Sequence, residues 1–579
     1  MRNAEIASVL NELADLMELH GEDRYRIARY RNAAASVEHY TEPVEDLARE
    51  GRLQEIRGVG ESIGGKIAQY LETGRISALD ALRRKISPAA VTLMNLPGIG
   101  PKRALLFTER LNVKTIADLE RAIESGEVAA LPRVGEKTAA HILEEIRRLR
   151  GRSGRLPLGG ALSVAEEVVR ELKRCKAVRE ITPAGSLRRM KESVGDIDIL
   201  VSSAEPGAVM DAFVRLPSIR EVLAAGETRA SVVTHADVQV DLRVVSPASY
   251  GAALQYFTGS KAHNVKLRTI AIGMGYKLNE YGVWEGDRRI AGRTEEGVYR
   301  ALGLTWQPPE VREDTGEVEL AIKGRTPSIV ALDDIHGDLH AHTRLSDGAD
   351  TVEEMVHAAT RAGYAYLAIT DHSQALGVAR GLTEDELRAE HALIRRLNET
   401  ARGVRVLCGV EVDIRVNRRL DCSDAFLSEC DVVVASIHSA FQRGRAEQTA
   451  RLVAAIEHPG VDIIGHPTGR MLGKRLGYEI DLGAVLDAAA RTGTALEVSA
   501  QPERLDLNDD AIRAAVARGV MLAINTDAHH RDQLALMRFG VATARRGWAP
   551  RQLVLNTKSR DQIVRWLRER RARARVSVA

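Results

Sequence analysis

Beyond residue 330 the sequence alternates between short apolar runs and stretches with helical spacing, and this alternation limits the possible folds more than any other feature. The apolar runs occupy residues 366–369, 404–410, 432–437, 461–464, 495–498 and 520–524. Strands that alternate with helices predict a parallel sheet, either closed as a barrel or doubly wound. We therefore expect an α/β domain over this part of the chain.

Histidines and carboxylates gather in the same region, where eleven of the sixteen histidines lie. Asp338-Leu339-His340-Ala341-His342 puts alternate side chains on one face of an expected strand. Similar motifs follow in order: Ser346-Asp347-Gly348, Asp371-His372, Glu411, His438, Gly465-His466-Pro467 and Asp527-Ala528-His529. A single such histidine would more often be a buried side chain with a hydrogen-bond partner. The ordered series instead predicts a metal site at the carboxyl ends of parallel strands.

These motifs resemble the PHP (polymerase and histidinol phosphatase) domain, a distorted barrel of seven strands with a trinuclear metal centre. The resemblance implies three divalent ions, Zn²⁺, Mn²⁺ or Fe²⁺, since imidazole and carboxylate ligands suit all three. It implies nine ligands: His340, His342, Asp347, His372, Glu411, His438, His466, Asp527 and His529. It also implies phosphoester hydrolysis, with Arg470 as a phosphate ligand. Ser499 and residues 417–419 depart from the family pattern, but neither supplies a ligand, so we expect an active site.

A second group of carboxylates lies earlier in the chain. Asp196 and Asp198 are spaced to share one face of an expected strand, and Asp241 lies on another apolar strand. Three clustered carboxylates stay ionised only with cations between them, and hard oxygen ligands favour Mg²⁺ or Mn²⁺. Such ions support phosphoryl transfer. The nearby run Gly185-Ser186-Leu187-Arg188-Arg189 adds arginines that can hold a triphosphate.

The run 185–198 resembles the nucleotidyltransferase signature of the family X DNA polymerases, the group of DNA polymerase beta. Tyr256-Phe257-Thr258-Gly259-Ser260 matches the family's nucleotide-pocket motif, and Asn279-Glu280-Tyr281 matches a further segment. The resemblance implies that Asp196, Asp198 and Asp241 bind the catalytic metals. It implies nucleotide contacts from Gly185, Ser186, Arg189, Tyr256, Phe257, Gly259, Ser260, Asn264 and Arg268. Gln239, Lys261 and His263 depart from the family pattern and leave sugar and base selectivity open.

Glycine-containing turns recur in the first 150 residues. Three similar segments at 56–60, 96–100 and 131–135 each precede an expected amphipathic helix. Glycines let a backbone approach a phosphate closely, and the following helix presents free N–H groups. One such turn would be an ordinary capping loop, but three predict helix-hairpin-helix contacts to a nucleic-acid backbone. The glycines concerned are Gly58, Gly60, Gly98, Gly100 and Gly135.

The amino-terminal helices resemble the lyase domain of the same family. Lys66 aligns with the Schiff-base lysine that removes a 5′-deoxyribose phosphate, and such a lysine needs a lowered pKa and a phosphate contact. Ser62 stands where a phosphate-binding lysine is usual. Lyase chemistry and a plain backbone contact remain equal alternatives for Lys66.

Composition excludes other classes of protein. Four cysteines without a CxxC pair argue against a disulfide framework and a thiolate zinc finger. No apolar run approaches the roughly 18 residues of a membrane span, and no signal-like amino terminus is present, so we expect a cytoplasmic, nucleoid-associated protein without a membrane partner. The net charge of +2 gives no indication of nucleic-acid binding by itself.

The order of these segments resembles the bacterial and archaeal family X DNA polymerases with a carboxy-terminal PHP domain. The expected fold is a multidomain α and α/β chain with helical helix-hairpin-helix domains, a nucleotidyltransferase palm with a small α+β thumb, and a distorted (β/α)7 barrel. The expected boundaries are 1–85 for the lyase-like domain, 86–155 for a DNA-binding domain, 156–250 for the palm, 251–305 for the nucleotide-selecting subdomain, 306–332 for a linker and 333–579 for the PHP domain.

The resemblance implies a DNA-directed DNA polymerase that fills short gaps in base excision repair. Its barrel would be a metal-dependent 3′–5′ exonuclease, or carry related AP endonuclease or 3′-phosphatase activity. The expected partners are gapped or nicked duplex DNA, dNTPs and other repair proteins, with the chain itself a monomer. Three alternatives stay open: a nuclease whose polymerase half only binds DNA, a polymerase with a structural barrel, and a template-independent transferase acting on RNA ends.

Overall fold

The computed structural model describes most of the chain. The described residues are 3–143, except 21, 39–43, 57, 84–88, 91–92, 94–98, 100, 112, 132–133, 137 and 141, and 155–578, except 377–378 and 401–402. Two compact units result, Met1–Gly154 and Arg155–Ala579. None of the described helices is long and apolar enough to cross a membrane.

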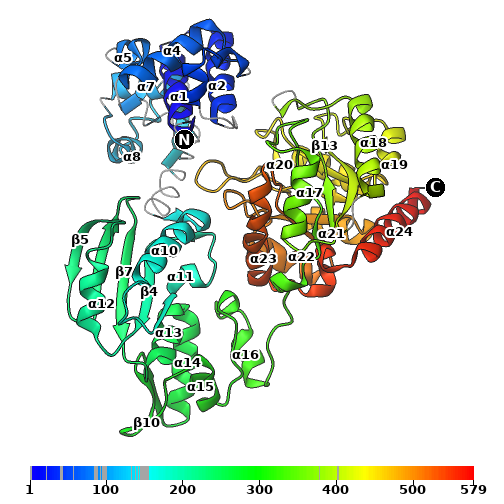
Figure 1. Cartoon of the computed structure of the whole chain (residues 1–579). Helices are drawn as coiled ribbons and strands as arrows, with labels where there is room; N and C mark the ends of the chain where they lie inside the picture. Colours follow the sequence, from blue (N-terminus) through cyan, green and yellow to red (C-terminus); the bar gives the residue numbers. More distant parts are fainter. Residues whose placement is uncertain are drawn as a thin grey trace. The chain divides into compact units, whose positions relative to one another are not determined.

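The unit Met1–Gly154 consists of helices wherever it is described (Figure 1). Its helices are α1 (Asn3–Leu19), α2 (Arg24–Glu38), α3 (Val44–Arg49), η1 (Leu53–Glu55), α4 (Glu61–Thr73), α5 (Ser77–Arg83), α7 (Pro101–Arg110) and α8 (Ile116–Glu124). One hydrophobic core joins them, and it includes Leu10 of α1, Ile67 of α4 and Phe107 of α7. Thr115 caps α8 in a capping box with Asp118, which satisfies free N–H groups at the start of that helix.

The second unit begins with a five-stranded sheet, which we call the palm. Its strands lie in the order β2 (Glu180–Pro183), β4 (Ile197–Ser202), β7 (Gln239–Val245), β6 (Arg229–Thr234) and β5 (Ile219–Ala225). A small sheet pairs β1 (Leu156–Pro157) with β3 (Ser193–Val194), and α11 (Gly185–Arg188) lies between β2 and β3 in the chain. Helices α10 (Leu158–Leu172) and α12 (Pro206–Phe213) contact each other and the strands of the palm.

The next segment, which we call the thumb, is a small α+β structure. It contains α13 (Tyr250–Thr258), α14 (Lys261–Gly273), α15 (Glu295–Ala301) and the antiparallel sheet of β8 (Tyr276–Asn279), β9 (Gly282–Glu285) and β10 (Arg288–Ala291). Its core includes Leu267, Val283 and Tyr299.

The segment expected as an interdomain linker is not open chain over its first half. It carries η2 (Pro309–Val311) and α16 (Glu317–Ile322), and Val318 and Ala321 belong to the thumb core. Arg312 and Glu317 are fully buried, with Arg312 Nη1 2.7 Å from Glu295 Oε1 and Glu317 Oε1 2.7 Å from His263 Nδ1. The Pro- and Glu-rich composition predicted a linker. The prediction could not include the ion pairs that bury these charges, because their partners are not neighbours in the sequence.

The last part of the chain is a parallel sheet of seven strands in sequential order. The strands are β11 (Gly337–Asp338), β12 (Tyr366–Ile369), β13 (Arg405–Asp413), β14 (Val432–Ser436), β15 (Ile463–Ile464), β16 (Ala495–Ser499) and β17 (Leu522–Asn525). The helices are η3 (Leu332–Asp334), α17 (Val352–Arg361), α18 (Glu384–Thr400), α19 (Asp424–Glu429), α20 (Arg445–Glu457), α21 (Leu482–Thr492), α22 (Asp509–Ala517), η5 (Arg531–Leu536), α23 (Met537–Arg546), η6 (Arg551–Leu553), η7 (Leu555–Thr557) and α24 (Arg560–Val578).

The first and last strands meet, so the sheet is a nearly closed barrel. Ala341 and Ala528 form a parallel bridge, and His342 N donates to Ala528 O at 2.8 Å. Each of the six apolar runs predicted as strands overlaps one strand of this barrel, and the predicted fold class is confirmed. One detail of the prediction was wrong, because β11 ends at Asp338 and His340 and His342 lie in the loop beyond it.

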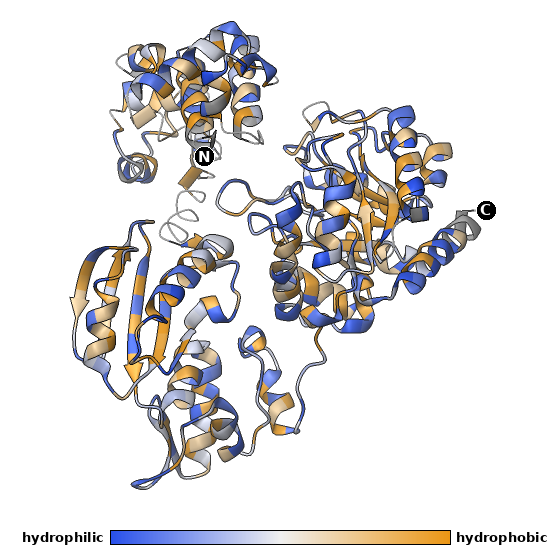
Figure 2. Ribbon diagram, in the orientation of Figure 1, coloured by the Kyte–Doolittle hydropathy of each residue, from blue (hydrophilic) through white to orange (hydrophobic). Residues whose placement is uncertain are grey.

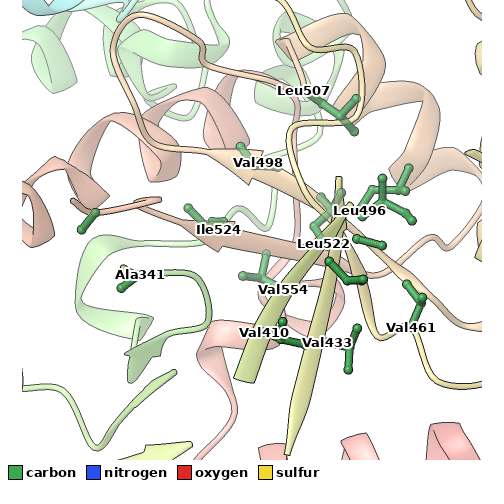
Figure 3. Packing of buried hydrophobic residues seen from close by; sticks show 14 of the residues in the cluster. Ala341, Val410, Val433, Val461, Leu496, Val498, Leu507, Leu522, Ile524 and Val554 are labelled. Atoms are coloured by element: carbon green, nitrogen blue, oxygen red, sulfur yellow. The ribbon is translucent and has the colours of Figure 1, made fainter. Parts of the chain in front are cut away.

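Alternate residues of the barrel strands enter two different cores, as the period of two requires. On β14, Val433 packs with the surrounding helices, whereas Val432 and Val434 share a smaller cluster with Leu567 of α24. Figure 3 shows Val410, Val433, Leu496 and Leu522 in the larger cluster. The strands are accordingly among the most hydrophobic parts of this domain (Figure 2). Glu411 and Glu497 lie on the same strand faces as the smaller cluster, toward the inside of the barrel.

Candidate active sites

The first site is a group of three aspartates at the ends of two neighbouring palm strands. β4 and β7 run parallel, and Asp198 and Asp241 stand opposite each other in their register. Asp196 precedes β4, and one carboxylate oxygen from each of the three residues lies within 4.8 Å of the other two. The structure thus brings together the three residues that the sequence predicts as metal ligands.

The electrostatics of this group fit a divalent cation. Burial, together with the charges of Asp196 and Asp241, raises the pKa of Asp198 to about 7. A hard cation between the three carboxylates would favour the charged form of Asp198. Gly185 has a φ of 60°, and a Cβ there would lie 2.3 Å from Asp198 Oδ2. Glycine is therefore needed next to this carboxylate.

The two arginines after Gly185 are both engaged in ion pairs. Arg188 forms a two-bond pair with Glu295, with N–O distances of 2.8 and 2.7 Å, and also donates to Thr258. Arg189 Nε lies 3.0 Å from Glu313 Oε1, and its Nη1 donates to Thr258 O. Arg188 therefore joins the palm to the thumb, whereas the charge of Arg189 acts on Asp198.

The nucleotide-pocket motif lies at the junction of α13 and α14. The Tyr256 and Phe257 rings meet edge to face with centroids 5.1 Å apart, and Arg243 lies over the Phe257 ring at 4.5 Å. Gly259 has a φ of 69°, and the Ser260 side chain caps α14 by accepting from His263 N. These residues are held in place by backbone geometry and by the cap.

Two further predicted nucleotide contacts lie on α14. The side-chain amide of Asn264 donates to Tyr256 O at 2.7 Å and accepts from Gln255 at 2.6 Å. Arg268 Nε donates to Asn264 O at 3.4 Å. Gln239, which departs from the family pattern, donates to Asp241 Oδ1 at 3.1 Å and so contacts the aspartate group directly.

The second site is a cluster of imidazoles and carboxylates at the carboxyl ends of the barrel strands. Three overlapping groups have ligand atoms within 4.8 Å of one another: His342, Asp347, His372 and His529; His340, His342, Glu411 and Asp527; and His372, Glu411 and His438. His466 Nε2 lies 3.2 Å from Glu411 Oε1. All nine residues that the sequence predicts as ligands thus meet in one place, with Glu411 at the centre.

The donor atoms of this cluster fit metal ions. His340 Nε2, both ring nitrogens of His342 and Glu411 Oε1 are buried without a hydrogen-bond partner. Unpaired buried polar atoms are costly, so the convergence of several of them indicates a ligand. Burial by itself would lower the pKa of His438 and His529. The nearby carboxylates outweigh this effect and raise both pKa values to about 9. Divalent cations would replace the protons that these imidazoles otherwise attract.

Supporting residues fix the orientation of the imidazoles, and the sequence prediction missed them. His340 Nδ1 lies 2.8 Å from Glu497 Oε1, and His438 Nδ1 lies 2.9 Å from Asp413 Oδ1. These contacts leave Nε2 of each ring free to face the cluster, as in metal sites with outer carboxylates. A signal was present in the sequence, because both carboxylates interrupt apolar runs that become buried strands.

The structure speaks against Arg470 as a phosphate ligand. Arg470 Nη1 donates to Glu192 Oε2 of the palm at 2.7 Å, and Nη2 donates to Leu505 O. Both terminal nitrogens are thus already bonded, one to the palm and one to the main chain of the barrel domain. Sequence spacing placed Arg470 near His466 but could not show that its guanidinium points toward another domain.

Arg504 is the arginine that does face the cluster. Its side chain is 20% exposed, and Nε lies 3.9 Å from Asp527 Oδ2. The structure shows no hydrogen bond from this guanidinium to another residue among the described part of the chain. Nothing in the sequence distinguished Arg504 from the many other arginines.

The first glycine turn of the amino-terminal unit has the expected form. Gly58 has a φ of 80°, and Gly64 N donates to Gly60 O in the first turn of α4. A pocket of about 370 Å³ is lined by this turn together with Arg29, Asn32 and Gln54. Gly135 also has a positive φ, of 67°, whereas Gly98 and Gly100 lie outside the described residues.

Lys66 lies on α4, one turn from the first glycine turn. Its Nζ donates to Ser62 O at 3.0 Å and to Ser62 Oγ at 3.1 Å, and it lies 5.7 Å from the centre of the Tyr30 ring. The amine of Lys66 therefore contacts neutral groups in these three interactions. They do not decide between lyase chemistry and a backbone contact.

Sequence models of four protein families match the chain. They are a helix-hairpin-helix domain at residues 1–76, a SAM-like helix-hairpin-helix tandem at 90–148, the DNA polymerase beta thumb at 253–313 and the PHP domain at 338–499. The described geometry of the glycine turns, the thumb and the barrel agrees with these matches.

Similar proteins cover either the whole chain or its last part. The DNA polymerase/3′-5′ exonuclease PolX of Bacillus subtilis is 37% identical over 572 residues, which is 98% of this chain and 100% of that protein. A probable phosphatase of Caldanaerobacter subterraneus is 30% identical over 41% of this chain and 92% of its own length. A probable phosphatase of Thermoanaerobacter sp. is 29% identical over 40% of this chain and 95% of its own length.

Proposed function

Because the chain belongs to the family X DNA polymerases that carry a PHP domain, we propose that it extends a DNA primer with dNTPs and removes nucleotides from 3′ ends at a second, metal-dependent site. The observation that carries this proposal is the presence of two separate metal-ligand groups in one chain, the three aspartates of the palm and the nine-residue cluster of the barrel. The full-length relative from Bacillus subtilis is named for both activities.

In the palm, Asp196, Asp198 and Asp241 would hold Mg²⁺ or Mn²⁺. When bound, such ions would supply Lewis-acid chemistry for phosphoryl transfer at the α-phosphate. Gly185, Ser186 and Arg189 would bind the triphosphate, since the charge of Arg189 acts on Asp198. Tyr256, Phe257, Gly259 and Ser260 would contact the sugar, Asn264 the base edge and Arg268 the template strand.

In the barrel, the nine-residue cluster would hold three divalent ions of the Zn²⁺, Mn²⁺ or Fe²⁺ type. Such ions supply Lewis-acid chemistry for the hydrolysis of a phosphodiester. Glu497 and Asp413 keep the imidazoles of His340 and His438 in the orientation that leaves Nε2 available. Arg504, in place of Arg470, would donate to an oxygen of the terminal phosphodiester. The same site would accept abasic or 3′-phosphate ends as related substrates.

The substrate would be a gapped or nicked duplex. The amino-terminal unit offers the turn at Gly58 and the turn at Gly135 for contacts to a DNA backbone, which position a duplex without reading its sequence. Gap filling in base excision repair, with other repair proteins as partners and the chain acting as a monomer in the cytoplasm at the nucleoid, is the role that fits these parts. In that role Lys66 would either add lyase chemistry or make a backbone contact.

The first experiment would follow a 5′-labelled primer on a one-nucleotide gapped duplex with Mn²⁺, with and without the four dNTPs. A polymerase with a 3′–5′ exonuclease lengthens the primer by one nucleotide with dNTPs and shortens it without them. A primer that only shortens, whatever the dNTP supply, would refute the polymerase assignment and leave a nuclease.

A further inference from the structure

Glu313, in the segment that follows the thumb, places one carboxylate oxygen among three cations. Its Oε1 lies 3.0 Å from Arg189 Nε, 3.1 Å from Arg546 Nη1 and 3.5 Å from Lys191 Nζ. Arg189 and Lys191 come from the palm, and Arg546 lies on α23 of the barrel domain. One side chain therefore connects three parts of the second unit.

Arg546 holds this arrangement firmly. Its side chain is only 4% exposed, and its Nη1 also donates to the backbone oxygen of Arg189 at 2.8 Å. Its Nη2 lies 2.5 Å from Asp509 Oδ2. Arg546 thus contacts both Glu313 and the main chain of Arg189, whose guanidinium also meets Glu313.

The charges around Glu313 would attract an anion that carries more negative charge than one carboxylate. Three cations face Glu313 and Asp509, which leaves a net positive charge in a half-buried place. Although burial raises the pKa of Glu313, the charges of Arg189, Arg546 and Lys191 lower it below its usual value. A nucleoside triphosphate carries several negative charges and would compete with Glu313 for Arg189.

Arg189 also lies where a triphosphate would need it. A Cβ on Gly259 of the nucleotide-pocket motif would lie 3.1 Å from Arg189 Nη1. The guanidinium therefore sits beside the pocket on one side and acts on the aspartates on the other. Thr258 O accepts from Nη1, whereas Nε is occupied by Glu313 and becomes available to a phosphate when that contact breaks.

We propose that Glu313 is an internal counter-ion for Arg189, which the triphosphate of an incoming nucleotide displaces, so that Glu313 sets the affinity for nucleotides. This inference rests on the proposed function, in which Arg189 binds the triphosphate. Glu313 is thus a residue that lowers nucleotide affinity, and Arg546 of the barrel domain positions it.

The test measures nucleotide binding without chemistry. Full-length protein is bound to a one-nucleotide gapped duplex whose primer ends in a 2′,3′-dideoxynucleotide, and the matching dNTP is titrated in Mg²⁺. The variant is Glu313→Gln, which keeps the shape and removes the charge. Glu310→Gln is the matched control, because Glu310 pairs with Arg545 of the same barrel helix at 2.8 Å without contacting Arg189.

Glu313→Gln should lower the Kd for the dNTP about tenfold, as expected when a charge-assisted competitor is removed, whereas Glu310→Gln should leave it unchanged. Glu313→Asp, which keeps the charge on a shorter stem, should tighten binding by less than Glu313→Gln. Melting curves would show that each variant is folded.

Unchanged or weaker binding by Glu313→Gln would overturn the inference, and so would equal tightening by Glu310→Gln, which would indicate general loosening of the interface. If the proposed function itself is wrong, the titration gives a different result, because the wild-type protein would then bind no dNTP at all.

Discussion

Asp198 and Asp241 stand opposite each other in the register of two parallel strands, β4 and β7. This pairing brings together carboxylates that one helix and two strands separate in the chain. Burial, with the charges of Asp196 and Asp241, raises the pKa of Asp198 to about 7, so the group is arranged for a cation. The barrel cluster is far from this pair in sequence and has its own ligands, which makes the two sites separable by mutation.

Asp241→Ala should reduce primer extension at least about a hundredfold and leave 3′–5′ degradation intact, because it removes one palm metal ligand only. His340→Ala should do the reverse. Both are measured on the gapped duplex with labelled primer, and each variant is the control for the other. Loss of both activities in either single variant would contradict two independent sites.

Gly185→Ala should lower the rate of single-nucleotide incorporation by roughly a hundredfold, because a Cβ 2.3 Å from Asp198 Oδ2 must displace that carboxylate. The positive φ at this position adds a cost of about 1–2 kcal/mol to the folded state. Gly207→Ala is the control, since a Cβ there meets no atom within 4 Å. Normal incorporation by Gly185→Ala would show that Asp198 does not need its present position.

Arg504→Met should lower kcat/KM for 3′–5′ degradation about 10- to 100-fold, the range expected for one charge-assisted contact to phosphate. The metal content, measured by elemental analysis, should not change, because Arg504 is not among the ligands. Arg470→Met is the comparison, since its guanidinium is bonded to Glu192 and Leu505. A larger loss in Arg470→Met would restore Arg470 as the phosphate ligand.

Glu295→Gln should destabilise the protein in a pH-dependent way. Burial opposes ionisation of Glu295, but Arg312 and Arg188 lower its pKa from 4.5 to about 2. A lowered folded-state pKa stabilises the fold by about 3 kcal/mol above pH 4.5, and this contribution is lost as the pH falls through about 2. Denaturant unfolding at pH 7 should therefore show the full difference between wild type and variant, and unfolding near pH 3 a smaller one.

Glu296→Gln provides the control for this measurement, because Glu296 is the exposed neighbour of Glu295 on α15. It should unfold like the wild type at both pH values. A Glu295→Gln difference that stays constant with pH would show that the ion pairs with Arg188 and Arg312 do not stabilise the thumb.

Local pattern was sufficient for much of the fold. The apolar runs predicted the barrel strands because strands buried on both faces need continuous apolar sequence. The spacing of Asp196 and Asp198 and the series of histidine motifs predicted the residues that meet in the two clusters, since metal ligands follow strand ends. These features depend on neighbours in the chain, which a sequence displays directly.

Ion pairs between residues that are distant in the sequence could not be predicted from the sequence. The residues after the thumb had a linker composition, yet Arg312 and Glu317 are buried against Glu295 and His263. Arg470 had the spacing of a phosphate ligand, yet Glu192 binds it, and Arg504 had no distinguishing pattern, yet it faces the cluster. A guanidinium reaches several directions from one backbone position, and only packing selects one.

The sequence by itself therefore determined the family, the order of the domains and the metal-binding residue types, because these follow from local periodicity and motif spacing. Only the tertiary structure decided which carboxylate each arginine meets, including Glu313 against Arg189. The physical reason is that ion pairs of long side chains are set by the three-dimensional packing of distant segments, and the sequence of either segment alone does not contain that information.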